Sequence, residues 1–171
     1  MVTGRSLSRA VGSTTSGIAV ALALSWAEMA VAADAERVIQ LTQTGCQFLE
    51  SEGGVDRGFE PRSAEDCNRI NGETGDQRLA NAEILELSPG TYTFRVTNTD
   101  VPYELGFWLR DAEYQLGNPL HKLTKVSVSG GGLEQGQTED YTVELEPGEY
   151  LYSCPAQPDP ELQVGRQGLI S

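Results

Sequence analysis

The side chains best suited to redox or metal chemistry are three cysteines, Cys46, Cys67 and Cys154, and one histidine, His121. Thiolate and imidazole groups bind soft and borderline metals such as Cu⁺ and Zn²⁺. His121 and Cys154 could form a two-ligand metal site, or a catalytic pair in which the imidazole activates the thiol. The plainer interpretation is a surface histidine and a small buried thiol, because no Lys or Arg lies near Cys154 in the sequence to lower its pKa.

The cysteines also predict a disulfide if the chain enters an oxidising compartment. Cys46 and Cys67 both lie in an irregular segment that precedes the regular strands, so we favour a bond between them, with Cys154 left free. It would close a loop of 22 residues and stabilise the fold by about 3 kcal/mol. Other pairings remain open, including a Cys154–Cys154 bond between two chains.

The N-terminal residues 1–33 have the features of a signal peptide. Two arginines precede an apolar run from Gly17 to Ala27, and small residues stand just before Asp34. The run is shorter than the roughly 20 apolar residues of a membrane-spanning helix, and Glu28 ends it. We therefore expect a periplasmic or secreted protein that is cleaved before Asp34 and has no membrane span; an uncleaved anchor is the alternative.

The charge of the chain limits its partners. Twelve Lys and Arg stand against 25 Asp and Glu, a net charge of −13, and removal of residues 1–33 would leave −14. A surface this acidic repels nucleic acid and anionic lipid. Residues 34–171 have a length that suits one domain, for which we expect an unknown envelope protein or a small ligand as partner.

Most of this domain is predicted to be β-strand. Short segments alternate apolar and polar residues and are separated by turns rich in Gly, Pro and Asp, which is typical of an antiparallel sandwich or barrel. The expected strands cover residues 36–44, 83–87, 91–98, 104–110, 123–129, 140–146, 149–154 and a short part of 161–170.

Two other segments have distinct patterns. Residues 45–82 form an insertion, in which Ser63 to Asp66 match a capping box that predicts a helix from Ala64, weakening at Gly72, with a second helical turn over 77–82. The run Ser129–Gly132 contains three glycines and is predicted to be a flexible turn.

One turn motif occurs twice. Leu87-Ser-Pro-Gly-Thr-Tyr-Thr-Phe94 is repeated as Leu145-Glu-Pro-Gly-Glu-Tyr-Leu-Tyr152, and Cys154-Pro155 follows the second copy. Each copy predicts a tight turn between two strands. The order and spacing of the two hairpins resemble the cupredoxin, or blue-copper, family over residues 83–170. The resemblance implies an all-β fold, a Greek-key antiparallel β-sandwich, here with a short helical, disulfide-stapled insertion at 45–82.

The same resemblance implies a copper site, but its ligands are mostly missing. Cys154 matches the family's cysteine ligand, whereas Tyr103 stands where the family has its first histidine. The loop after Cys154 holds neither His nor Met, and the two methionines of the chain both lie within residues 1–33. A blue-copper centre needs two imidazoles and a thiolate, so one histidine is too few.

Three functions are compatible with these features. The first is a non-enzymatic binding or accessory module of the cell envelope that lacks a standard blue-copper site and needs no cofactor. The second is a copper-handling or electron-transfer protein with an unusual metal site around Cys154, with or without His121. The third, a thiol enzyme, has the least support, because no orienting group or oxyanion motif is recognisable.

Overall fold

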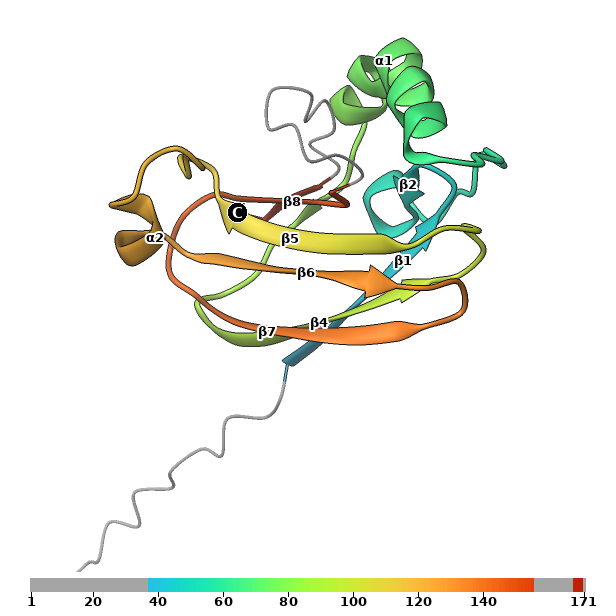
Figure 1. The fold of residues 1–171 in the computed structure, drawn as a ribbon. Helices are drawn as coiled ribbons and strands as arrows, with labels where there is room; N and C mark the ends of the chain where they lie inside the picture. Colours follow the sequence, from blue (N-terminus) through green and yellow to red (C-terminus); the bar gives the residue numbers. More distant parts are fainter. Residues whose placement is uncertain (1–36, 156–167, 171) are drawn as a thin grey trace, which may run out of the picture. The chain divides into compact units, whose positions relative to one another are not determined.

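The computed structural model describes residues 37–155 and 168–170, which form two β-sheets with few helices (Figure 1). The predicted signal peptide and residues 156–167 lie outside the described residues. The elements are β1 (Arg37–Thr44), β2 (Gln47–Phe48), a 3-10 turn (Glu50–Glu52), α1 (Ala64–Ala80), β3 (Ile84–Leu85), β4 (Gly90–Asn98), β5 (Leu105–Asp111), α2 (His121–Thr124), β6 (Ser127–Leu133), β7 (Thr138–Leu145), β8 (Tyr150–Ser153) and β9 (Gly168–Ile170).

The strands are divided between a four-stranded and a five-stranded sheet. The first has the order β2-β1-β4-β7 and the second the order β3-β9-β8-β5-β6. Most neighbours are antiparallel, as expected, but β1 pairs with β4 and β3 pairs with β9 in parallel. The alternating pattern of a strand does not encode its direction. The parallel β1–β4 pair is possible because the long segment between them returns the chain to the same end of the sheet.

The two sheets share one hydrophobic core, so they form the predicted sandwich-like pair of layers. Phe94 of β4 and Phe107 of β5 are both fully buried and stack across the layers with ring centroids 6.0 Å apart. Tyr141 of β7 approaches Phe107 more closely, at 4.9 Å. Buried residues alternate along β7, and period-2 alternation is what places one face of each strand in the core.

The glycine run differs from its prediction as a flexible turn. Gly130, Gly131 and Gly132 lie within β6, where Gly130 pairs with Phe107 of β5. A Cβ at Gly130 would lie only 2.7 Å from the ring of Tyr141, so glycine is needed there to make room for that ring. The predicted strand 123–129 is also wrong at its start, because residues 121–124 form the short helix α2.

Helix α1 is longer than predicted. It begins at Ala64 as expected but continues through Gly72 to Ala80 as one helix of 17 residues. Ser63 precedes it with extended backbone and no side-chain cap, and the carboxylate of Asp66 accepts instead from the backbone N–H of Arg62. In the described part of the chain, the helices are too short or too polar to span a membrane.

The loop after β4 is organised by one buried amide. The side chain of Asn98 is fully buried and donates to the carbonyl oxygens of Val101, Tyr103 and Leu133 at 3.1–3.3 Å, while its Oδ1 accepts from the N–H of Val101. A buried amide with four partners fixes the backbone around it. Asn98 thereby fixes the position of Tyr103 at the end of the sandwich where β5 begins.

Candidate functional site

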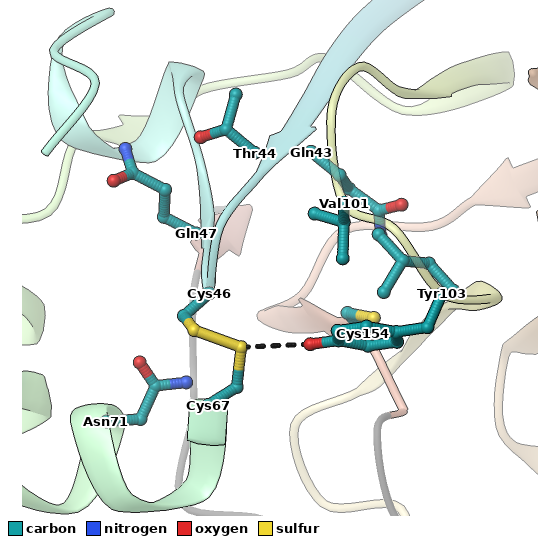
Figure 2. Close-up of a pocket in the computed structure, with 10 residues that line it drawn as sticks. Gln43, Thr44, Cys46, Gln47, Cys67, Asn71, Val101, Tyr103 and Cys154 are labelled. Atoms are coloured by element: carbon teal, nitrogen blue, oxygen red, sulfur yellow. Dashed lines mark hydrogen bonds between the residues drawn. A yellow bond between two sulfur atoms is a disulfide. The ribbon is translucent and has the colours of Figure 1, made fainter. Parts of the chain in front are cut away.

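All three cysteines line one small pocket. It lies between α1 and the end of the sandwich and has a volume of about 40 Å³, enough for a few water molecules (Figure 2). The lining residues come from five parts of the chain: Gln43, Thr44, Cys46, Gln47, Cys67, Asn71, Val101, Tyr103, Leu105 and Cys154. We call this the cysteine pocket.

Cys46 and Cys67 form the predicted disulfide, with an S–S distance of 2.07 Å and a Cα–Cα distance of 5.0 Å. Cys67 lies in the first turns of α1, and Cys46 lies in the tight turn between β1 and β2. Cys46 has a φ of +58°, which is unusual for a residue other than glycine. The disulfide thus joins the helix of the insertion to the end of the four-stranded sheet.

Cys154 is the free cysteine among the described residues and follows the last residue of β8. Burial raises the pKa of its thiol to about 11, although the residue as a whole is only partly buried; a hydrogen bond from the backbone N–H of Gly106 offsets part of that increase. The thiolate is the nucleophilic and metal-binding form. At neutral pH the thiol of Cys154 is therefore protonated and weakly reactive.

Tyr103 connects the thiol to the disulfide. Its hydroxyl donates to Sγ of Cys67 at 3.2 Å, and Figure 2 shows the ring beside Cys154. The pKa of Tyr103 is raised to about 12. The main cause is burial of the hydroxyl, and the second is the nearby Cys154. At physiological pH the hydroxyl of Tyr103 is therefore neutral and donates a hydrogen bond. A histidine at this position could instead have bound a metal ion through its imidazole.

Two buried oxygens at the pocket have no hydrogen-bond partner among the described residues. Gln43 is 1% exposed and its Nε2 donates to the carbonyl oxygen of Gly106 at 2.8 Å, but its Oε1 is unpaired. Thr44 is 4% exposed, and its Oγ1 is also unpaired. A buried polar atom without a partner costs about 1–3 kcal/mol. A small molecule or ion in the pocket that interacts with these oxygens would recover that energy.

His121 does not lie at this pocket. It begins α2, which follows the far end of β5, whereas the pocket lies at Leu105, where β5 starts (Figure 1). The six steps from Leu105 to Asp111 span roughly 20 Å. The Nδ1 of His121 accepts from the backbone N–H of Gln115 at 3.0 Å, so the imidazole stabilises its own loop. The structure does not bring His121 and Cys154 together.

The cysteine pocket does not fit a blue-copper ion. Its lining residues offer one thiol, the side-chain oxygens of Gln43, Thr44, Gln47, Asn71 and Tyr103, and no imidazole. Among the described residues, no three His, Cys, Asp or Glu side chains are grouped in a way that could hold a metal ion. A trigonal site of two imidazoles and a thiolate is therefore not available here.

Sequence analysis missed Gln43, Thr44 and Asn98 as residues of this region. Gln43 lies two positions after Leu41, the buried apolar residue of β1, so it belongs to the same face of the strand. A long polar side chain on a buried face is unusual, and that signal could have pointed to it. No sequence signal placed Thr44 at the same pocket as Cys154, because only the fold brings the ends of β1 and β8 together there.

The raised pKa of Cys154 predicts a pH-dependent stability. In the unfolded chain the thiol loses its proton near pH 9, but in the folded protein only near pH 11. Between these values the unfolded state binds fewer protons, so stability falls as pH rises. Melting temperatures measured from pH 8 to 10.5 are expected to fall more steeply for wild type than for Cys154→Ala. Equal slopes for the two proteins would contradict the buried, protonated thiol.

The structure defines the class of this chain as a two-sheet β-protein with a disulfide-tethered helix. Comparisons with known proteins assign it to no family. No family model matches the sequence, and no curated protein is similar to it. A solved structure, described as "Crystal structure of Lac15 from a marine microbial metagenome", aligns with 81% of this chain at 15% identity and a TM-score of 0.34. The alignment covers 27% of that protein, so this chain spans about a quarter of its length.

Proposed function

We propose that this chain is an exported, cupredoxin-like binding or accessory module of the cell envelope, without enzymatic activity and without a blue-copper centre. Its binding site is the cysteine pocket, and its fold is the Greek-key sandwich of the cupredoxins. One observation carries this proposal. Tyr103 and Cys154 are 51 residues apart in the sequence, the resemblance gives them the positions of the first histidine and the cysteine ligand, and they line the same pocket.

The chemistry of the pocket supports binding of a small polar ligand in place of copper. The unpaired oxygens of Gln43 and Thr44 accept hydrogen bonds, while Val101 and Leu105 supply an apolar wall. At about 40 Å³, the pocket admits a ligand of only a few heavy atoms, or the tip of a larger one. The raised pKa of Cys154 supports a non-enzymatic role, because reactive thiols depend on a lowered pKa.

The test is a titration of the purified protein with Cu²⁺, followed by its visible spectrum. We expect no intense thiolate-to-copper band at one equivalent, because no pair of imidazoles is available to complete the site. The Cys154→Ala protein is the matched control, and both spectra should be the same. A strong band that saturates at one equivalent and disappears in Cys154→Ala would refute the proposed absence of blue copper.

A metal-binding protein with an unusual site is the second candidate. The observation that favours it is the unpaired Oε1 of Gln43, a buried oxygen that lines the same pocket as the thiol of Cys154. An ion that binds the folded state alone raises the melting temperature, and the rise grows with the logarithm of the ion concentration relative to its Kd. This candidate predicts a rise with Cu⁺ or Zn²⁺ that is lost in Cys154→Ala and reduced in Gln43→Ala. Equal melting temperatures with and without metal would exclude it.

A further inference from the structure

The cysteine pocket has two walls that belong to different parts of the fold. Gln43, Val101, Tyr103 and Cys154 come from the sandwich, and Asn71 comes from α1, together with the disulfide that joins the two (Figure 2). Figure 1 shows α1 at the end of the sandwich, beyond the strands. How open the pocket is on the side of α1 therefore depends on how firmly α1 is held.

Few noncovalent contacts hold α1. Only Cys67 and Arg78 are buried among its residues. Two glycines, Gly72 and Gly75, lie within it, and each lowers helix stability by about 1 kcal/mol relative to alanine. A helix with so little buried apolar surface depends on its attachments at the two ends. Those attachments are the disulfide near its start and the ion pair of Arg78 near its end.

The covalent attachment ends directly at the pocket, because Cys46 and Cys67 both line it. The Sγ of Cys67 also accepts the hydrogen bond from Tyr103, so the same sulfur holds the ring that lies beside Cys154. Without the disulfide, the turn at Cys46 loses the bond that restrains its left-handed backbone, and the first turns of α1 lose their link to β1. The Arg78 ion pair, near the other end of α1, would then act as a hinge.

We infer that the Cys46–Cys67 disulfide is a redox latch that closes α1 over the cysteine pocket. With the disulfide formed, α1 shields Cys154. With the two cysteines as thiols, the first turns of α1 move away and the pocket opens to solvent. Closure transfers two electrons and two protons from the thiols of Cys46 and Cys67 to a small disulfide oxidant, which becomes two thiols. Opening is the reverse reaction with a dithiol reductant, which becomes a disulfide.

The latch gives the site proposed above two states: the closed one described here, whose pocket of about 40 Å³ admits only a few heavy atoms, and an open one that is exposed to solvent. The inference rests on that proposed function only in taking the cysteine pocket as the site. Both cysteines of the latch are less than 8% exposed, so the closed state also shields its own disulfide. The latch therefore stays closed once oxidised, and opening requires sustained reduction.

The experiment compares the rate at which iodoacetamide alkylates Cys154 in wild type and in Cys46→Ser/Cys67→Ser. Cys154 is the single free thiol in both proteins, so the two rates compare directly. We expect alkylation at least tenfold faster in the double variant, with the near-ultraviolet circular dichroism of the core aromatics retained. The rate should be nearly independent of urea below the unfolding transition, because a local opening exposes little surface.

Two controls separate the latch from general loss of stability. Val143→Ala removes core volume in β7, away from the pocket, and leaves the disulfide intact, so its alkylation rate should match that of wild type. If the double variant fails to fold, wild type reduced with dithiothreitol is desalted and alkylated, and the Cys154 peptide is quantified by mass spectrometry. The same tenfold acceleration is expected.

Two results would overturn the latch. One is an alkylation rate that changes less than twofold when the disulfide is absent. The other is an acceleration that rises with urea as steeply as global unfolding does. Neither result depends on whether copper or any other ligand binds, so this experiment and the copper titration can fail independently.

Discussion

The free energy of unfolding is expected to fall by about 3–5 kcal/mol when Glu52 is replaced by alanine. Glu52 accepts hydrogen bonds from Arg78 and Arg57, and the side chains of Glu52 and Arg78 are only 5% and 8% exposed. Removing the carboxylate would leave the guanidinium of Arg78 buried without a counterion. Breaking a buried ion pair in this way is far more costly than losing an exposed one.

An exposed ion pair on α1 itself provides the matched control. Arg69 and Glu73 lie 3.7 Å apart with side chains that are 61% and 66% exposed, so Glu73→Ala should change stability by less than about 0.5 kcal/mol. Urea unfolding of both variants and of Glu52→Ala/Arg78→Met measures the difference. The double variant should be more stable than Glu52→Ala, because it leaves no unpaired charge. Equal losses in Glu52→Ala and Glu73→Ala would show that burial does not strengthen the first pair.

The Glu52 result also bears on the cysteine pocket. Arg78 donates to the carbonyl oxygen of Cys46 at 2.9 Å and to Oδ1 of Asn71 at 2.7 Å, both of which belong to residues that line the pocket. The ion pair therefore supports the wall of the pocket that α1 supplies, in addition to holding the end of the helix. In Glu52→Ala we expect that wall to loosen even with the disulfide intact.

The second large effect is expected from Phe107→Ala, which should also destabilise the protein by about 3–5 kcal/mol. Phe107 is fully buried, and its ring lies 4.9–6.3 Å from the ring centroids of four aromatic side chains in both sheets. Those neighbours are Phe48, Phe94, Tyr141 and Tyr152. Loss of the ring removes contacts with both layers and leaves a cavity that this close-packed aromatic cluster only partly fills.

Phe107→Leu separates the cavity from the loss of aromatic contacts. Leucine fills most of the volume, so its cost should be clearly smaller than that of alanine, and the remaining loss reports the aromatic pairs, worth about 0.5–1.5 kcal/mol each. Chemical denaturation of the three proteins gives the comparison. A cost below about 1.5 kcal/mol for Phe107→Ala would mean that this position is not the centre of the core.

The strands are largely predictable because each depends on a local pattern. Residues 91–98 and 140–146 alternate apolar and polar side chains, and they form β4 and β7 with small changes at their ends. The Cys46–Cys67 bond is also predictable, because two cysteines in one irregular segment favour each other once export is predicted from residues 1–33. Both inferences use the pattern of one short segment of the sequence and need no knowledge of contacts between distant segments.

The errors in β6 and α1 share one cause, which is that distant contacts override local preference. The three glycines of β6 have the composition of a turn, but the ring of Tyr141 requires the space that they leave. Gly72 favours an early end of the helix, yet α1 continues past it, because the disulfide at Cys67 and the ion pair at Arg78 hold both of its ends. Local propensity is a weak guide wherever a partner far along the chain makes such contacts.

By itself, the sequence determined which chemistry is available. One histidine and three cysteines are counts that no fold can change, so the shortage of imidazole ligands is a property of the composition alone. Only the tertiary structure decided which groups meet. It placed Cys154, Tyr103 and Gln43 at one pocket and His121 at the far end of β5, and it raised the pKa of Cys154 by burying the thiol. Side-chain spacing along the chain carries no such information, because contacts between sheets and the solvent exclusion that shifts a pKa arise only when distant segments pack together.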